Sequence, residues 1–201
     1  RPVSLSIMRK KYDKQDIIAK GASLIRRNGY HDTGINDILN EVGIPKGSFY
    51  NFFASKEEFG HLIVKHYGNQ QLLWLQQMLE NGDKSPLKRL THLYQAIVEA
   101  NRSEGFRYGC LVNNMSMEPA GHNEGLAKVN AEQFHSWLEA IGKCIQEGQD
   151  LGEIRNDYSH IELADFIHSS LYGALSREKM LRSDITTQKN LEMVFLFLQS
   201  K

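Results

Sequence analysis

The hydrophobic residues of the chain recur at helical spacing from one end to the other. Apolar positions at i, i+3, i+4 and i+7 predict amphipathic helices, whereas strict alternation predicts strands, and no stretch alternates convincingly. The spacing predicts helices over 14–28, 33–42, 46–53, 55–81, 86–102, 108–119, 123–149, 159–181 and 187–199. The sequence therefore predicts an all-α protein.

Residues that favour helix ends agree with this division. Gly29 is a favourable stop for the first helix, and we expect the hydroxyl of Thr33 to cap the second. Ser55 and Glu58 have the spacing of a capping box, in which each side chain accepts a backbone N–H at the helix start. Pro86 fits the first position of a helix, where its missing N–H costs nothing.

The segment 33–53 is the most informative part of the sequence. Two short helices joined by a glycine-containing turn make a helix-turn-helix candidate, whose second helix fits the major groove of DNA. Its polar residues offer donors to phosphates and base edges, and Gly47 allows a close backbone approach; the donors are Lys46, Ser48, Tyr50 and Asn51. Phe49 and Phe53 are expected to pack inward. An ordinary helical hairpin remains open at this point.

Composition narrows the class of protein. Of the 201 residues, 41% are hydrophobic and 24% charged, which suits a globular chain that buries a core. No run approaches the roughly 20 apolar residues of a membrane span, and residues 1–8 lack the apolar core of a signal peptide. Cys110 and Cys144 are far apart, so we expect a cytoplasmic protein without a disulfide, metal or cofactor. Residues 1–7 are excluded from the fold prediction.

The net charge of zero hides a weak polarity. Residues 1–60 hold 10 basic against 7 acidic residues, and residues 61–201 hold 14 against 17. A basic head on an acidic body is compatible with binding to a phosphate backbone.

Residues 14–60 resemble the tetracycline-repressor (TetR) family. The shared positions are Ile18-Ala19, Gly29, Thr33, Ile38, Val42-Gly43-Ile44, Lys46-Gly47-Ser48-Phe49-Tyr50, Phe53, Lys56 and Phe59. The resemblance implies a dimeric regulator, most often a repressor, that leaves its inverted-repeat operator when a small ligand binds. It implies a DNA-binding domain over 8–54 and a helical ligand-binding and dimerisation domain over 55–201.

Carried over by position, the resemblance implies DNA contacts for seven residues: Thr33, Lys46, Gly47, Ser48, Tyr50, Asn51 and Lys56. Two departures from the family pattern leave the operator sequence open. Pro45 stands where Ser or Thr is usual, and Asn51-Phe52 replaces the more usual Tyr/His pair. We expect Phe52 to pack rather than to touch a thymine methyl group.

The last two helices are the expected homodimer interface. Their apolar and small residues suit half of an intersubunit four-helix bundle; they are Ala164, Phe166, Ile167, Ser169, Ser170, Leu171, Gly173, Ala174, Leu175, Leu191, Val194, Phe195 and Leu198. The same stripes would also suit the core of the monomer. The family resemblance favours the dimer.

A ligand site is expected among the middle helices, in an apolar cavity with a few polar groups. The residues chosen for it are Cys110, Asn113, Asn114, Met117, Phe134, Trp137, His168 and Tyr172. Cys110 lies near a predicted helix start and near Arg107, which favours a reactive thiolate, and Tyr108-Gly-Cys-Leu resembles a segment of TetR-type electrophile sensors. A space-filling cysteine and a noncovalent apolar ligand are the alternatives.

Two other functions remain open from the residues alone. Residues 33–53 could serve a helical protein-interaction module that binds no DNA. A Cys110-dependent enzyme is the third hypothesis, although no nucleophile elbow, P-loop, zinc-protease or dinucleotide motif accompanies the cysteine.

Overall fold

The computed structural model describes residues 12–80 and 82–199, and this part of the chain is helical. The helices are α1 (Lys14–Asn28), α2 (Ile35–Val42), α3 (Lys46–Tyr50), α4 (Lys56–Leu79), α5 (Pro86–Ser103), α6 (Leu111–Met117), the 3-10 helix η1 (Ala120–His122), α7 (Glu124–Asp150), α8 (His160–Leu181) and α9 (Ile185–Leu198). The all-α prediction is confirmed. Residues 1–7, excluded above, lie outside the described part.

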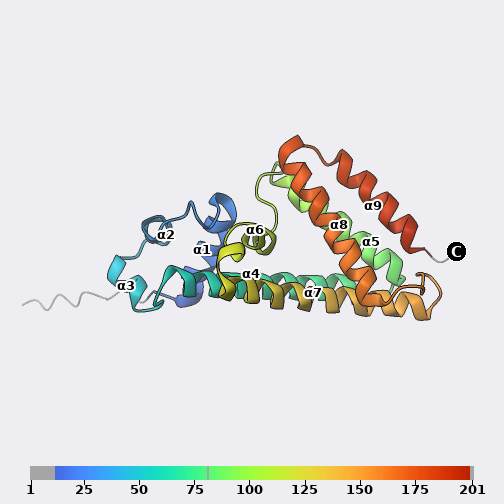
Figure 1. Cartoon of the computed structure of the whole chain (residues 1–201), viewed down its shortest axis with the longest axis horizontal. Helices are drawn as coiled ribbons and strands as arrows, with labels where there is room; N and C mark the ends of the chain where they lie inside the picture. The colour runs from blue at the N-terminus through green and yellow to red at the C-terminus, as the bar shows by residue number, and fades with distance from the viewer. Residues whose placement is uncertain (1–11, 81, 200–201) are drawn as a thin grey trace, which may run out of the picture.

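The molecule is elongated, with the three short N-terminal helices at one end (Figure 1). The long helices α4 and α7 pack side by side along its length, and α8 lies across α7 and contacts α9. α6 sits between the two ends, where it contacts α1, α4 and α7. This arrangement makes α4 and α6 the main connections between the N-terminal helices and the rest of the chain.

Three phenylalanines hold α3 against α1 and α4. The rings of Phe49 and Phe53 lie 5.0 Å apart, and each packs on Phe59, at 5.3 and 4.7 Å between ring centroids. All three rings are buried, so the prediction that Phe49 and Phe53 face inward is confirmed. Gly21 of α1 permits this packing, because a Cβ there would lie 2.4 Å from the Phe59 ring.

The helix ends follow the predicted signals with one exception. Ser55 Oγ accepts the Glu58 N–H at 3.0 Å, and the Glu58 carboxylate accepts the Ala54 N–H at 2.6 Å. The predicted Thr33 cap is wrong, because Gly34 is the N-cap of α2. The Thr33 hydroxyl instead donates to the Gly29 carbonyl at 2.6 Å, which closes the loop after α1 and buries the side chain completely.

The helix predicted over 108–119 begins later, at Leu111, because the residues before it form a turn. Gly105, Phe106 and Gly109 all have positive φ, between 58° and 68°, which a helix does not accept. Cys110 is the N-cap residue of α6. The cysteine therefore lies at the helix start, as predicted.

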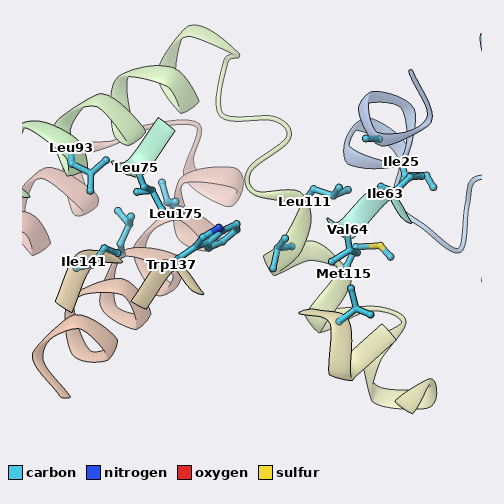
Figure 2. Packing of buried hydrophobic residues seen from close by; sticks show 14 of the residues in the cluster. Ile25, Ile63, Val64, Leu75, Leu93, Leu111, Met115, Trp137, Ile141 and Leu175 are labelled. Atoms are coloured by element: carbon cyan, nitrogen blue, oxygen red, sulfur yellow. The ribbon is translucent and has the colours of Figure 1, made fainter. Parts of the chain in front are cut away.

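The buried core continues from the N-terminal helices into the body. Ile25 of α1 lies with Ile63 of α4 and Leu111 of α6 in one group, and Leu75, Trp137 and Leu175 lie in another (Figure 2). The Trp137 indole N–H donates to the Gly68 carbonyl at 3.0 Å and thereby fixes α7 on α4. Among the described residues, no helix is long and apolar enough to cross a membrane.

Candidate DNA-reading surface and ligand cavity

The outer face of α3 presents polar groups to solvent. Lys46, Gly47, Tyr50 and Asn51 are exposed, and Ser48 is half-buried. Tyr50 has 47% of its surface exposed, although its ring edge packs on Phe49. Asn51 follows the last helical residue as the C-cap. The residues predicted to contact DNA in this segment thus share one accessible face, opposite the phenylalanine cluster.

Packing within the described chain does not explain why residue 47 is a glycine. A Cβ built there meets no heavy atom within 4 Å, and the residue is not among the glycines with positive φ. The fold therefore tolerates a side chain at this position. Its expected role, a close approach to a DNA phosphate, stays a prediction.

Two residues expected at the DNA surface have structural contacts instead. Thr33 is fully buried and bonded to Gly29, so its side chain offers no atom to a phosphate. Lys56 is half-buried, and its ammonium donates to the Tyr30 carbonyl at 2.6 Å and lies 4.4 Å from the Tyr30 ring centroid. Burial lowers the pKa of Lys56. Both side chains brace the loop that follows α1.

The same loop is held from the body by Glu118, at the end of α6. Its two carboxylate oxygens accept the backbone N–H groups of Tyr30 and His31, at 3.1 and 2.6 Å. These bonds join residues that are 88 and 87 positions apart in the sequence. The Glu118 carboxylate therefore connects the end of α6 directly to the loop between α1 and α2.

A cavity of about 410 Å³ opens in the body, close to the start of α6. It is lined by four of the residues predicted for a ligand site, namely Cys110, Trp137, His168 and Tyr172. Volume and lining are typical of small-molecule sites, which are mostly apolar with a few polar groups. The structure thus brings half of the predicted set to one cavity.

A phenol group contacts the sulfur of Cys110. The Tyr172 hydroxyl donates to Sγ at 3.3 Å, and Tyr67 lines the same cavity. Burial raises the pKa of both tyrosines, so they keep their protons. Cys110 as a whole is partly exposed and is one of the residues that line the cavity.

Arg26 is a cation near the cysteine that the sequence did not indicate. Arg107 is exposed, whereas the Arg26 guanidinium donates to the Gly109 carbonyl at 2.6 Å and pairs with both oxygens of Glu104. Arg26 belongs to the last turn of α1. The first helix is consequently bonded to the residue directly before Cys110.

The other four predicted ligand residues lie elsewhere. Asn113 and Phe134 line a separate apolar groove between α6 and α7. Asn114 bonds to the Tyr108 carbonyl and to Lys179, at 2.9 and 3.3 Å. Met117 has 82% of its surface exposed. Asn113, Asn114 and Met117 belong to α6, whereas Cys110 precedes that helix as its N-cap residue, so the helical spacing that grouped them does not apply. Phe134 of α7 does not line the cavity, but its ring packs on those of His168 and Tyr172, which do.

The predicted dimer stripe of α9 faces the core of the chain itself. Leu191, Val194, Phe195 and Leu198 are all buried against the body. The exposed large apolar residues of the last two helices include one member of the predicted interface, Phe166; the full set is Phe166, Met180, Leu181, Ile185, Met193, Leu196 and Phe197. We call this set the α8–α9 face. The interpretation that the original α9 stripe belongs to the monomer core is the correct one.

Sequence reasoning missed several residues of the cavity wall. Arg26, Tyr67, Trp74 and Asn101 come from α1, α4 and α5, and each occupies an ordinary helical position. Their periodicity marks them only as inward-facing. A buried arginine or asparagine on an apolar face was the one available signal, because such a group needs a partner.

Comparison with known proteins agrees with the geometry. Residues 17–60 match the family described as bacterial regulatory proteins, tetR family, and residues 86–194 match the tetracyclin repressor-like C-terminal domain. The HTH-type transcriptional repressor DhaR of Mycobacterium sp. (strain GP1) is 32% identical over 182 residues, which cover 90% of each chain. The transcriptional regulator AcuR of Cereibacter sphaeroides is 30% identical, over 85% of this chain and 78% of its own.

A solved structure shows the same architecture. The regulatory protein TetR from Rhodobacter sphaeroides superposes with a TM-score of 0.85 and 26% identity, over 92% of this chain and 97% of that one. Its likeness extends over both the helix-turn-helix and the body. The chain belongs to the tetR family of bacterial regulatory proteins and is a helix-turn-helix, DNA-binding regulator of transcription.

Proposed function

We propose that this protein is a cytoplasmic repressor that binds an inverted-repeat operator as a homodimer and leaves it when a small molecule occupies the cavity. One observation carries the proposal: α1, whose Gly21 packs on Phe59 of the phenylalanine cluster behind α3, is bonded through Arg26 to the wall of the cavity. A ligand that moves this wall acts on the orientation of the DNA-reading end.

DNA contact is proposed for Lys46, Gly47, Ser48, Tyr50 and Asn51, which share the exposed face of α3. Lys46 supplies a charge for a phosphate, and the short polar side chains suit base edges. Because one short helix reads few bases, two copies on half-sites about 34–36 Å apart or somewhat more give the specificity that one copy lacks.

Dimerisation is proposed through the α8–α9 face. Its exposed apolar side chains alternate along α8 with Ser169 and Gly173, which are also exposed. A Cβ at Gly173 would meet no atom of the described chain, so packing within one copy does not require a glycine there. Close packing against a second copy would require it. A contiguous apolar surface of this kind is typical of an obligate interface.

An electrophile is a second candidate trigger beside a noncovalent ligand, and the hydrogen bond on the Cys110 sulfur favours it. In such a reaction the thiol gives its proton to water and Sγ bonds to the β-carbon of an unsaturated carbonyl compound. The carbon–carbon π bond breaks, and the α-carbon takes a proton back from water, so the net change is addition of S–H across the double bond. The adduct would fill the cavity and displace the Tyr172 hydroxyl from the sulfur. Either trigger perturbs the same wall.

A gel-shift experiment tests the proposal. Palindromic fragments from the DNA beside the gene are incubated with the protein at low salt, with and without candidate ligands. Binding that Tyr50→Ala abolishes supports the repressor. A protein-interaction module would show no binding to any fragment, and a Cys110-dependent enzyme would turn over a reactive ester until Cys110 is replaced.

A further inference from the structure

Two buried polar groups at the cavity wall lack a hydrogen-bond partner. His168 of α8 and Asn101 of α5 both line the cavity and are 2% and 5% exposed. Nε2 of His168 and Oδ1 of Asn101 have no partner among the described residues. Buried polar atoms in proteins are nearly always paired, so such atoms beside an apolar cavity indicate that a ligand completes the pairing.

The tautomer of His168 follows from its neighbour. Its Nδ1 lies 3.2 Å from the Tyr94 hydroxyl, and burial lowers the pKa of the histidine to about 3, so the ring is neutral. Burial also raises the pKa of Tyr94, which keeps its proton. Because the described residues offer that proton no other acceptor, Tyr94 donates to Nδ1 and the hydrogen of the ring sits on Nε2. The unpaired atom is therefore a donor.

Asn101 supplies the complementary group. Its Nδ2 donates to the carboxylate of Glu178, which is fully buried behind it. The amide orientation is fixed by this bond, because a carboxylate accepts hydrogen bonds and does not donate them. Oδ1 is consequently left as an acceptor, and the cavity wall holds one unpaired donor and one unpaired acceptor.

The charges around the cavity disfavour an ionised ligand. Among the described residues that line the cavity, the cation is Arg26. Its Nε already donates to the Gly109 carbonyl, and its two Nη groups donate to the Glu104 carboxylate. Glu178 stands behind Asn101 and repels an anion. The walls are aromatic, and His168 lies between Tyr172 and Trp137, at 4.7 and 6.0 Å between ring centroids. Because Nε2 itself is covered, a ligand has to displace a neighbouring ring to reach it.

We propose that the cavity binds a neutral, planar aromatic molecule that carries both a hydrogen-bond acceptor, for His168 Nε2–H, and a donor, for Asn101 Oδ1. Hydroxylated aryl ketones and aldehydes are the chemical class. This inference rests on the proposed role of the cavity in ligand response. It specifies recognition without a covalent bond to Cys110.

The probe set is 4-hydroxyacetophenone, the hydrocarbon of similar shape 4-isopropyltoluene and the anion 4-hydroxybenzoate. Calorimetric titration of the full-length protein without DNA gives each affinity. The quenching of tryptophan fluorescence gives a second readout, because both tryptophans of the chain, Trp74 and Trp137, line the cavity. The ketone should bind about tenfold more tightly than either of the other two, since each of them loses a pairing or adds an unpaired charge.

Variants separate recognition from folding. His168→Phe keeps the ring but removes the donor and should weaken ketone binding about tenfold, whereas His168→Gln offers an amide N–H and should restore part of it. Asn101→Leu should weaken binding to a similar degree. Arg177→Gln, on the exposed side of the same helix, is the control and should bind like the native chain. Helicity by circular dichroism confirms that each variant is folded.

Three outcomes would overturn the inference. They are equal affinity for the ketone and the hydrocarbon, tighter binding of the anion, and ketone affinity unchanged in both His168→Phe and Asn101→Leu. Failure of all three probes to bind at millimolar concentration also overturns it. Because the titration contains no DNA, a separate gel shift tells whether operator binding, and with it the proposed function, survives that failure.

Discussion

Arg26 and Gly109 are joined by a hydrogen bond of 2.6 Å across 83 positions of sequence. The bond connects the end of the first helix to the residue before Cys110, and Glu104 holds the same guanidinium from the other side. A molecule that binds beside Cys110 therefore contacts a part of the cavity wall that is hydrogen-bonded to α1 of the DNA-binding helices.

Replacement of Arg26 by glutamine should uncouple the two ends. The side chain is about three-quarters buried and bonded to two partners, so we expect unfolding to become easier by about 1–3 kcal/mol. Ligand should still bind, but it should release less of the operator. Urea unfolding measures the loss of stability, and ligand titration of the operator complex measures the release. Arg27→Gln is the matched control, because the neighbouring Arg27 forms a surface pair with Glu41; equal losses in the two variants would refute the coupling.

Lys46 and Lys56 should respond differently to replacement by alanine. Loss of a phosphate contact by Lys46→Ala should lower the slope of log K against log salt by about one, for every DNA sequence. Lys56→Ala should leave that slope unchanged and reduce stability by about 1 kcal/mol, because Lys56 bonds to Tyr30. Gel shifts over a salt series and urea unfolding check the pair. A clear decrease of the slope in Lys56→Ala would show that Lys56 contacts a DNA phosphate after all.

Cys110 and Cys144 should differ in reactivity. Cys144 is buried and bonded to the Pro86 carbonyl, and burial raises its pKa to about 11, so its thiol stays protonated at neutral pH. Exposure to a quinone or hypochlorite should release the operator from the native chain and from Cys144→Ser, but not from Cys110→Ser. Mass spectrometry locates the adduct. Equal release from both serine variants would retire Cys110 as a sensor.

Acid should destabilise the fold through His168. Its pKa falls from the ordinary 6.5 to about 3 on burial, so between these values the unfolded chain binds a proton that the folded chain does not. This contribution is complete above pH 6.5 and is lost by about 1.4 kcal/mol per unit as the pH falls below it. Glu178, whose pKa burial raises, acts in the opposite sense.

The histidine contribution is isolated by subtraction. Urea unfolding of the native chain and of His168→Phe is compared at pH 7, 6 and 5, so that Glu178 and the other groups cancel. The difference in the free energy of unfolding should shrink steadily below pH 6.5. A difference independent of pH would show that the histidine is charged in the folded state or accessible to solvent.

The α8–α9 face should control assembly. Leu196→Glu places a charge in the proposed interface without touching the core, because Leu196 is 70% exposed. Sedimentation should show a monomer at micromolar concentration, with operator binding lost. Glu192→Gln, another exposed residue of α9, should remain a dimer. A dimeric Leu196→Glu would place the interface elsewhere.

The sequence alone predicts the helices well because their signals are local. Ser55 and Glu58 act within one turn, and the phenylalanines of residues 49–53 are three or four positions apart. Distant contacts leave no such pattern. Nothing local connects Arg26 with Gly109 or Glu118 with Tyr30, and the inward side of α9 satisfies a monomer core and a dimer equally well. Those pairings depend on how the helices pack.

The phenylalanine cluster has a consequence for divergence among relatives. Phe49, Phe53 and Phe59 lock the inner side of α3 against Gly21, so a change there disturbs the fold. The outer positions Lys46, Gly47 and Asn51 are exposed, and a side chain at Gly47 would meet no atom of the described chain. Selection can therefore exchange the outward residues one at a time, and the protein can acquire a new operator while its own folding free energy stays almost the same.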